Sequence, residues 1–422
     1  MNILVIGQGG REHALCWKLK ESPLARKIYC APGNGGTSKD VVNVDIPVRE
    51  HSEVIDFCQK NKVDLVVVGP EVPLAGGISD DLEKARIKVF GPSRAAARME
   101  SSKVFAKELM LKYNVPTADF QVFSDYGKAV ENIKSKDFPI VIKADGLAAG
   151  KGVIVAGSRQ EAIDAAGDML VKKVFGPAGE KIIVEDYLDG EEASILVLTD
   201  GENIIPLASS QDHKRVFEGD KGPNTGGMGA YSPAPVVDEG LFEEILEKII
   251  YPTVKGLKSE GIEYKGVLYC GLMITKRGLS VLEYNARFGD PETQVILPRL
   301  KSDLAKLLMA AAEGDLSGEV LEWDRRDCAC VVLASGGYPG RYEMGKEITG
   351  LNEAKKEGAL IFHAGTLEEN EKCVTSGGRV LNVVGMGGSI EHAIANTYRA
   401  VSKIQFEGMH YRKDIGQRAL NK

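Results

Sequence analysis

The sequence contains no uninterrupted apolar run of the roughly 20 residues that a membrane-spanning helix needs. Its first residues, Met1 to Gly7, lack the basic stretch followed by a long apolar run that is typical of a secretory signal peptide. Positive charge is not in excess either, since 53 Lys and Arg against 60 Asp and Glu give a formal net charge of -7. An acidic chain is poorly suited to nucleic acids and anionic membranes. We therefore expect a cytoplasmic protein that binds neither nucleic acid nor membrane.

Cysteine is scarce and scattered, with seven residues in the whole chain. The closest pair is Cys328 and Cys330, and no His or further Cys lies near enough in sequence to complete a zinc site. A fold held together by disulfides would be much smaller. The cysteines are therefore expected to be buried thiols in a reducing compartment.

At 422 residues the chain is too long for one ordinary hydrophobic core, which predicts three or four packed subdomains. Short apolar runs alternate with amphipathic stretches, a pattern that indicates an α/β protein. Ile3 to Ile6 is typical of a buried parallel strand, and it is followed by a Gly-rich turn and a helix over 12–20. Further strands are predicted over 27–31 and 65–68.

The rest of the chain predicts a helical region, a small α/β unit, a larger β-rich section and a separate C-terminal unit. The expected helices cover 94–113, 160–170 and 390–404, and the expected strands cover 139–143, 153–155, 182–185, 329–333, the neighbourhood of Ile361, and 380–384. Strands over 265–274 and 279–284 should form a hairpin through the turn 275–278.

The first glycine loop, Gly7-Gln8-Gly9-Gly10-Arg11-Glu12, lies between the first strand and the first helix. It is not a dinucleotide fingerprint, because Glu12 fills the third small position and no acidic residue ends the second strand. The loop either holds an anion with its backbone N–H groups or is a tight turn without a ligand. A second loop, Gly33 to Gly36, follows the next strand and would share the same sheet edge.

A second glycine cluster, Asp145 to Gly152, joins two β-runs and contains small residues plus Lys151. It is not a Walker loop, since no Ser or Thr follows the lysine. A plain hairpin loop would not need so many flexible residues, because flexibility lowers stability. The composition favours a mobile flap that closes over a triphosphate, with Lys151 meeting phosphate oxygens.

A third constellation, Glu283-Tyr284-Asn285-Ala286-Arg287, places Glu283, Asn285 and Arg287 on one face of a strand. A carboxylate beside a side-chain carbonyl suits Mg²⁺, and an arginine could stabilise a transferring phosphoryl group. The alternative is a solvated face with a surface ion pair. The carboxylates of Asp290 and Glu292, which follow at once, favour a metal–phosphate site.

A fourth region combines Gln211 to Arg215 with the glycine loop Gly222 to Gly229. Packed polar residues beside such a loop indicate the lining of a pocket for a small polar substrate. His213 is expected to be structural or exposed rather than a catalytic base.

These loops together resemble the phosphoribosylamine–glycine ligase (glycinamide ribonucleotide synthetase) family over the whole chain. Tyr284-Asn285-Ala286 departs from the family's Phe-Asn-Cys but keeps the Glu and the Asn. The matching stretches are Gly7-Gln8-Gly9-Gly10-Arg11-Glu12-His13-Ala14, Gly69-Pro70-Glu71, Lys143 to Gly152, Leu188-Asp189-Gly190-Glu191-Glu192, Gln211 to Arg215 and Arg287 to Glu292.

The resemblance implies an α/β and α+β multidomain protein with an ATP-grasp fold. Its expected parts are a Rossmann-like, parallel-sheet substrate-binding domain (1–101), a small ATP-grasp subdomain with a linker helix and the flap (102–192), a large subdomain with the metal site (193–325) and an α+β C-terminal domain (326–422). The implied reaction joins glycine to 5-phosphoribosylamine with ATP, giving glycinamide ribonucleotide, ADP and phosphate through a glycyl phosphate. Transfer of substrate or product to neighbouring purine enzymes is a further implication.

Residue roles follow from the resemblance and from the loops described above. Lys151 and Arg287 are expected to be catalytic by neutralising charge, and Glu283 and Asn285 to hold Mg²⁺ or Mn²⁺. The ATP-binding residues are expected to be Lys103, Lys143, Gly150, Lys151, Gly152, Glu185, Asp186, Leu188, Glu191 and Glu192. The substrate-binding residues are expected to be Gly9, Gly10, Asn34, Gly35, Asp212, Lys214, Asn224, Gly289, Asp290 and Glu292.

Three alternative functions stay open at this point: an ATP-grasp ligase for another acid or amine, a nicotinamide oxidoreductase, and a nucleotide-binding regulator without turnover. The loop sequence at Glu12 disfavours the second, and the intact set of Glu283, Asn285 and Arg287 disfavours the third.

Overall fold

A five-stranded parallel sheet in the order β3-β2-β1-β4-β5 forms the N-terminal part of the chain. The computed structural model describes residues 1–148 and 150–420. The predicted first strand and first helix are confirmed, with α1 beginning two residues earlier than expected. The elements are β1 (Asn2–Gly7), α1 (Gly10–Lys20), β2 (Lys27–Pro32), α2 (Thr37–Asp40), β3 (Val42–Asn43), α3 (His51–Asn61), β4 (Leu65–Val68), α4 (Glu71–Gly76), α5 (Ile78–Lys84) and β5 (Lys88–Phe90).

The helical region predicted over 94–113 is confirmed over 94–101 and 103–112, and Ser102 divides it into two helices. The structure has α6 (Arg94–Ser101) and α7 (Lys103–Lys112), with Ser102 in an extended conformation between them. The Ser102 hydroxyl accepts from Phe105 N (3.1 Å) and donates to Asp145 Oδ1 (3.0 Å). A serine that caps the second helix therefore ends the first one, and it sets Lys103 beside the loop that begins at Asp145.

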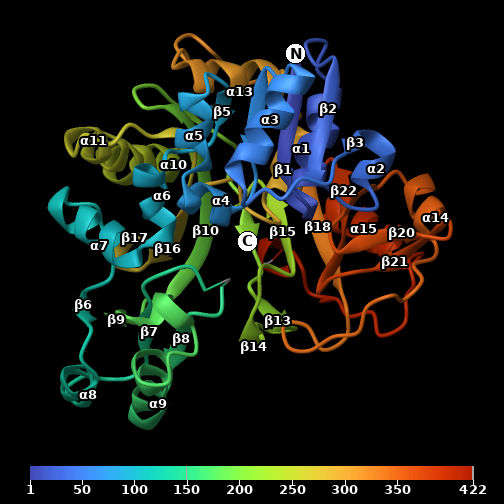
Figure 1. Cartoon of the computed structure of the whole chain (residues 1–422). Helices are drawn as coiled ribbons and strands as arrows, with labels where there is room; N and C mark the ends of the chain where they lie inside the picture. The colour runs from blue at the N-terminus through green and yellow to red at the C-terminus, as the bar shows by residue number, and fades with distance from the viewer. Residues whose placement is uncertain (149, 421–422) are drawn as a thin grey trace.

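A small four-stranded sheet, in the order β6-β9-β7-β8, follows these helices. Helices α8 and α9 pack on it around a hydrophobic core of its own. In Figure 1 this unit projects downward from the rest of the molecule. The predicted strands and helix are confirmed as β7 (Ile140–Ala144), β8 (Val153–Ala156), β9 (Ile182–Asp186) and α9 (Arg159–Leu170). The unit also contains β6 (Phe120–Phe123), α8 (Tyr126–Lys134) and a 3₁₀ turn (Gly176–Gly179), which the sequence analysis did not predict.

A second four-stranded sheet, in the order β11-β10-β16-β17, forms the centre of the molecule. The predicted hairpin is confirmed as the antiparallel pair β16–β17, and its register shifts between Gly271 and Leu272. The elements are β10 (Gly190–Asp200), β11 (Ile204–Pro206), α10 (Glu239–Ile245), a π-helical turn (Leu246–Ile250), α11 (Tyr251–Ser259), β16 (Lys265–Thr275), β17 (Gly278–Asn285), α12 (Thr293–Ile296), a 3₁₀ turn (Leu297–Arg299) and α13 (Leu304–Glu313).

The C-terminal sheet, in the order β12-β15-β18-β22-β19, takes two of its strands from the middle of the chain. The predicted helix over 390–404 is shorter than expected and ends at Val401. The elements are β12 (Gln211–Asp212), β13 (Arg215–Phe217), β14 (Lys221–Asn224), β15 (Gly229–Ser232), β18 (Asp327–Ala334), α14 (Leu351–Lys356), β19 (Leu360–His363), β20 (Thr366–Glu369), β21 (Lys372–Thr375), β22 (Arg379–Gly387), α15 (Ile390–Val401) and α16 (Gln417–Leu420).

The N-terminal, central and C-terminal sheets share apolar cores. One cluster contains Val5 of β1, Leu196 of β10, Val267 of β16 and Cys330 of β18, all at most 1% exposed. Six of the seven cysteines are buried and none forms a disulfide, in agreement with the prediction of buried thiols. Because three sheets bury side chains against one another, they form one body from which the small sheet extends.

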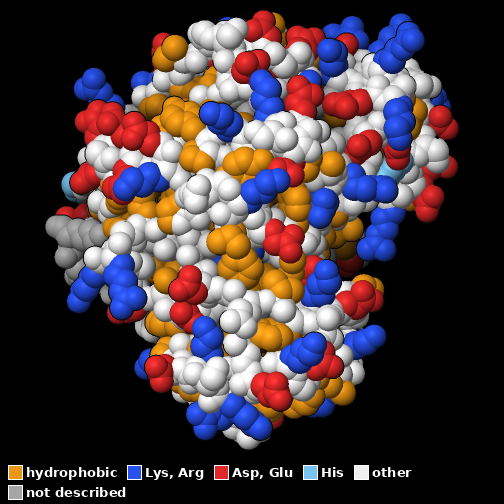
Figure 2. Space-filling view, turned by 90° about the vertical axis from the view of Figure 1, so that its left-hand side faces the viewer, with side chains coloured by type: hydrophobic (Ala, Val, Ile, Leu, Met, Phe, Trp, Pro, Cys, Tyr) orange, Lys and Arg blue, Asp and Glu red, His pale blue; other side chains and the backbone are white. Residues whose placement is uncertain are grey.

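The outer surface on the side of α7, α10 and α11 mixes charges of both signs. Figure 2 shows Lys and Arg side chains next to Asp and Glu side chains over this face. Within residues 1–148 and 150–420, no helix is both long enough and apolar enough to cross a bilayer.

Asn34 ties the N-terminal sheet to the C-terminal sheet. Its amide nitrogen donates to Gln8 O (2.9 Å) and His363 O (2.8 Å), and its Oδ1 accepts from Gly36 N (2.8 Å) and Thr37 N (3.0 Å). The side chain is 4% exposed, so each of these backbone groups depends on it rather than on water.

Replacement of Asn34 by Ala should therefore destabilise the protein. Loss of several buried hydrogen bonds is expected to lower the free energy of unfolding by about 2–4 kcal/mol. Urea unfolding followed by fluorescence measures this change, with the exposed Asn352→Ala as the matched control. An Asn34→Ala variant as stable as the control would contradict a structural role.

Candidate active site

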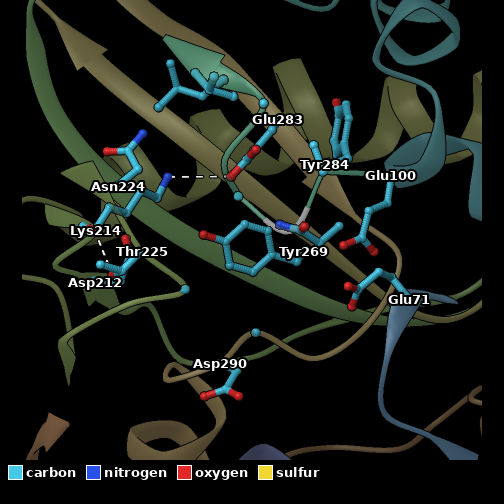
Figure 3. Close-up of a pocket in the computed structure, with 18 of the residues that line it drawn as sticks. Glu71, Glu100, Asp212, Lys214, Asn224, Thr225, Tyr269, Glu283, Tyr284 and Asp290 are labelled. Carbon is cyan, nitrogen blue, oxygen red and sulfur yellow. Dashed lines mark hydrogen bonds and ion pairs between the residues drawn. The ribbon is translucent and has the colours of Figure 1, made fainter. Parts of the chain in front are cut away.

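A cavity of about 1520 Å³ opens between the small sheet, the central sheet and the loops of the N-terminal and C-terminal sheets. In Figure 3, Glu283 and Tyr269 lie between Lys214, Asn224 and Asp212 on one side and the carboxylates of Glu71 and Glu100 on the other. Of the residues predicted from sequence, those that line this cavity are Gly9, Lys103, Lys143, Gly150, Lys151, Gly152, Glu185, Asp186, Leu188, Glu191, Glu192, Asp212, Lys214, Asn224, Glu283, Asn285, Arg287, Gly289, Asp290 and Glu292.

Three predicted substrate-binding residues, Gly10, Asn34 and Gly35, are not among the lining residues. A Cβ atom at Gly10 would collide with the side chains of Asn382 and Gln294. One at Gly35 would lie 3.2 Å from Thr366 Oγ1. The structure thus uses these positions to pack the N-terminal loops against the C-terminal sheet.

The side chain of Glu12 binds the backbone of the first glycine loop. Glu12 Oε2 accepts from Gly9 N (2.7 Å), and Glu12 Oε1 pairs with Arg11 Nε (2.5 Å). The Gly9 N–H group at the start of α1 is thus bonded to a carboxylate of the chain, where the sequence suggested an external anion. Arg11 also donates to Phe288 O (3.1 Å), which fixes the loop before Gly289 and Asp290.

In the cavity wall, the buried carboxylate of Glu185 forms ion pairs with two lysines. Lys107 Nζ lies 2.7 Å from Glu185 Oε2, and Lys143 Nζ pairs with Glu185 Oε1 and donates to Leu282 O (3.0 Å). Burial would raise the pKa of Glu185, but Lys143 and Lys107 outweigh it and hold that pKa below its ordinary value. The lysine predicted on an otherwise apolar strand therefore has a charged partner inside the cavity wall.

The loop predicted to be a flap runs from Gly146 to Gly152 along the cavity, and its residue Ala149 lies outside the described residues. Lys103 N donates to Asp145 O (2.9 Å), and Lys103 Nζ donates to Gly146 O (3.4 Å), so α7 holds the base of the loop. At its tip, Lys151 Nζ donates to Pro339 O (3.2 Å) of the C-terminal part. The Lys151 side chain thus connects this loop to the loop that follows β18 in the C-terminal part.

Glu283, Asn285 and Arg287 all reach the cavity, but Arg287 lies beyond the end of β17. Its guanidinium donates to Asn285 Oδ1 (3.3 Å) and pairs with Glu100 Oε1 (2.9 Å) and Glu71 Oε2 (3.4 Å). Burial first, and the nearby Glu71, raise the pKa of Glu100, while Arg287 opposes the rise. Sequence reasoning missed Glu100, because a single Glu in an amphipathic helix carries no local signal.

On the opposite wall, Lys214 lies among carboxylates. Its Nζ is 3.0 Å from Glu192 Oε2 and 3.6 Å from Glu283 Oε1. Burial raises the pKa of Asp212 to about 8, with Glu292, Glu192 and Glu283 adding to the rise and Lys214 opposing it. So many acidic groups around one lysine disfavour another negative charge, so Asp212 keeps its proton to a higher pH than an ordinary aspartate does.

Another charged pair joins Asp290, which was predicted from the sequence, to Arg379, which was not. Arg379, from β22, donates to Asp290 Oδ2 (3.0 Å) and thereby connects the C-terminal sheet to the 289–292 loop. His213 is buried at 1% exposure and does not line the cavity, so of the two positions expected for it, structural or exposed, it is not exposed. Among the described residues, no group of three or more His, Cys, Asp or Glu side chains is placed to hold a metal ion alone.

Solved structures with low sequence identity share this architecture. The biotin carboxylase domain of 2-oxoglutarate carboxylase from Hydrogenobacter thermophilus superposes with a TM-score of 0.72 at 14% identity, covering 100% of this chain and 98% of that one. A sequence model for the "Phosphoribosylglycinamide synthetase, ATP-grasp (A) domain" matches residues 101–293. The fold is therefore the predicted ATP-grasp fold.

Matches over the whole length then define the family. Models for the N and C domains of phosphoribosylglycinamide synthetase match residues 1–100 and 328–418. Enzymes named phosphoribosylamine–glycine ligase are 52% identical in Neisseria meningitidis serogroup B, covering 100% of both chains, and 51% identical in Escherichia coli O157:H7, covering 100% of this chain and 99% of that one. The chain belongs to the phosphoribosylglycinamide synthetase family, which confirms the resemblance seen in the sequence.

A crystal structure agrees with this assignment. The phosphoribosylamine–glycine ligase of Thermotoga maritima superposes with a TM-score of 0.84 at 35% identity, and the match covers 98% of this chain and 100% of that chain.

The protonated Asp212 predicts how stability changes with pH. Because its folded-state pKa is raised from 3.8 to about 8, the native protein keeps a proton that the unfolded chain releases, so this contribution to stability falls as pH rises through that window. Asp212→Asn removes the titration, and the slope of unfolding free energy against pH should become less negative by about 1.4 kcal/mol per pH unit. Urea unfolding at several pH values measures it. A slope equal to that of wild type and of the exposed control Asp56→Asn would contradict the assignment.

Proposed function

We propose that this chain is a phosphoribosylamine–glycine ligase, which joins glycine to 5-phosphoribosylamine with ATP and yields glycinamide ribonucleotide, ADP and phosphate in purine synthesis. The observation that carries the proposal is one cavity that gathers the lysines, the carboxylates and Arg287 of the family's motifs, in a chain that matches the family from end to end. The domain limits 1–101, 102–192, 193–325 and 326–422 are proposed with it.

The nucleotide would bind along the small sheet. Lys103, Lys143 and Lys151 bring positive charge to the cavity for the phosphates, and the segment from Glu185 to Leu188 would border the adenine. Glu191 and Glu192 start β10 and would meet the ribose hydroxyls. The flap glycines, Gly150 and Gly152, allow the backbone to approach the phosphates closely.

A divalent cation, Mg²⁺ or Mn²⁺, fits the residues at the end of β17. Glu283 supplies a carboxylate and Asn285 a side-chain carbonyl, both oxygen donors of the kind that hard cations prefer. Two protein ligands leave the remaining positions to phosphate oxygens and water, which suits a cation that arrives with the nucleotide. When bound there, the ion would neutralise phosphate charge.

The chemistry requires an activated carboxylate, because the oxide of a carboxylic acid is a poor leaving group. Attack of a glycine carboxylate oxygen on the γ-phosphorus of ATP forms a carbon–oxygen–phosphorus link and releases ADP. The amine of phosphoribosylamine then attacks the carbonyl carbon, phosphate leaves, and the amine loses a proton. Arg287 and Lys151 would neutralise the transferring phosphoryl group.

The other substrates would bind across the cavity from the nucleotide. Asp212, Lys214, Asn224, Gly289, Asp290, Glu292 and Gly9 line that side. Closure of the flap would exclude water, which would otherwise hydrolyse the acyl phosphate. A cytoplasmic location and direct transfer of substrate or product between neighbouring purine enzymes belong to the same proposal.

Substrate omission combined with an isotope label tests the reaction. ADP should form only when ATP, glycine and phosphoribosylamine are all present, and replacement of glycine by alanine or of the amine by ammonia should abolish it. Glycine carrying heavy oxygen in its carboxylate should pass one labelled oxygen to phosphate in each turnover, because that oxygen leaves with the γ-phosphoryl group. Mass spectrometry of the phosphate measures the transfer. Unlabelled phosphate with normal amide formation would contradict an acyl phosphate.

The proposed cation site predicts the effect of Glu283→Gln. Loss of one anionic ligand should lower kcat by about two to three orders of magnitude while the fold stays intact. Electron paramagnetic resonance should also show weaker Mn²⁺ binding in the presence of an ATP analogue. Glu202→Gln, whose side chain is 77% exposed, is the control. A folded Glu283→Gln variant with normal turnover and normal Mn²⁺ binding would exclude Glu283 as a ligand.

A further inference from the structure

Lys107 is a buried lysine on α7 whose ammonium group is bonded to two protein side chains. Its side chain is 3% exposed. Its Nζ pairs with Glu185 Oε2 at 2.7 Å and donates to Thr117 Oγ1 at 2.6 Å. A buried lysine needs such partners, and one of them, Glu185, lines the cavity. The geometry therefore directs the charge of Lys107 towards Glu185.

Glu185 shares its two oxygens between two lysines. Lys107 Nζ pairs with Glu185 Oε2, and Lys143 Nζ pairs with Glu185 Oε1. Lys143 Nζ also donates to Leu282 O at 3.0 Å. One negative charge thus faces two positive ones, and part of the positive charge of Lys143 is left to act on the cavity. Without Lys107, the whole carboxylate would be available to Lys143 and would neutralise it more fully.

A second connection runs from Lys107 to the strand that carries Glu283. Thr117 Oγ1 donates to Val281 O (2.8 Å), and Val281 N donates to Pro116 O (2.8 Å). Val281 lies two residues before Glu283 on β17. Lys107 consequently joins β9 of the small sheet, which carries Glu185, to β17 of the central sheet.

We propose that Lys107 is a positioning residue of the nucleotide site: by pairing with one oxygen of Glu185, it leaves Lys143 less fully neutralised by that carboxylate and oriented for the phosphates of a nucleoside triphosphate. This inference rests on the proposed ATP-dependent function and names the residue that prepares Lys143 for it. Lys107 also lines the cavity, but the partners of its ammonium group are the protein side chains Glu185 and Thr117, so it acts through Glu185 and Lys143.

Binding of a non-hydrolysable ATP analogue to the full chain, measured by calorimetry, tests the proposal. Lys107→Met should raise the Kd of the analogue by about 10- to 100-fold, the usual effect of removing a group that orients a ligand-binding side chain. The KM for ATP should rise similarly, while the KM for glycine stays within about twofold of wild type. Lys112→Met is the matched control, since Lys112 lies on the same helix with a 61% exposed side chain paired to Glu260.

A double-mutant cycle distinguishes positioning from general loss of packing. If Lys107 acts through Glu185, Lys107→Met should weaken analogue binding in the wild-type background and have less than about a threefold effect in a Glu185→Gln background. Equal factors in both backgrounds would overturn the proposal, and so would wild-type affinity in Lys107→Met. If Lys107→Met fails to fold, Thr117→Val provides the test, because it removes the hydroxyl that orients Lys107 and keeps the side-chain shape. Wild-type affinity in a folded Thr117→Val would then overturn the proposal.

The two levels of proposal fail in different ways. A wild-type chain that does not bind the analogue at all would contradict the proposed function itself. A wild-type chain that binds it, with Lys107→Met binding equally well, would contradict only the role of Lys107.

Discussion

Compensation of buried charge is the constraint on which the rest of the site depends. Lys214 lies among Glu192, Glu283 and Asp212, and Arg287 lies between Glu71 and Glu100. A charge taken out of water is tolerated only when it is paired, and Lys143, Lys214 and Arg287 each have a carboxylate partner in the cavity wall. These pairs also connect different segments, so the contacts that compensate the buried charges also hold those segments together.

The apolar cores determine which of these segments stay fixed. The N-terminal, central and C-terminal sheets share one buried cluster, so residues carried by them keep their relative positions. The small sheet has its own core and meets the others through polar contacts such as Lys143 to Leu282 O. Because an acyl phosphate must form away from water, a fixed reaction centre beside a more independent nucleotide-binding unit is a suitable arrangement for the proposed ligation.

The sequence predicted those site residues that sit in short local patterns, and it missed those whose role depends on distant partners. Glu283 and Asn285 were predictable because alternation along a strand puts both on one face. Glu100 and Lys107 look like ordinary helical residues until Arg287 and Glu185 are placed beside them. Conversely, Asn34 lies in a glycine loop that the sequence analysis assigned to substrate binding. In the structure its side chain instead bonds to His363 O, 329 residues away, and connects two sheets. The break at Ser102 was hidden for the same reason, since Asp145 supplies the bond that stabilises it.

The contact of Lys151 with Pro339 bears on how the flap would close. The lysine donates to a neutral carbonyl, Pro339 O, on the C-terminal side. A phosphate oxygen is a stronger acceptor for an ammonium group than a carbonyl, because the hydrogen bond becomes charge-assisted. Binding of a triphosphate would therefore replace the weaker bond with a stronger one and draw the loop towards the nucleotide. The free energy for closure would come from the substrate itself, so the loop would close when there is a phosphoryl group to protect from water.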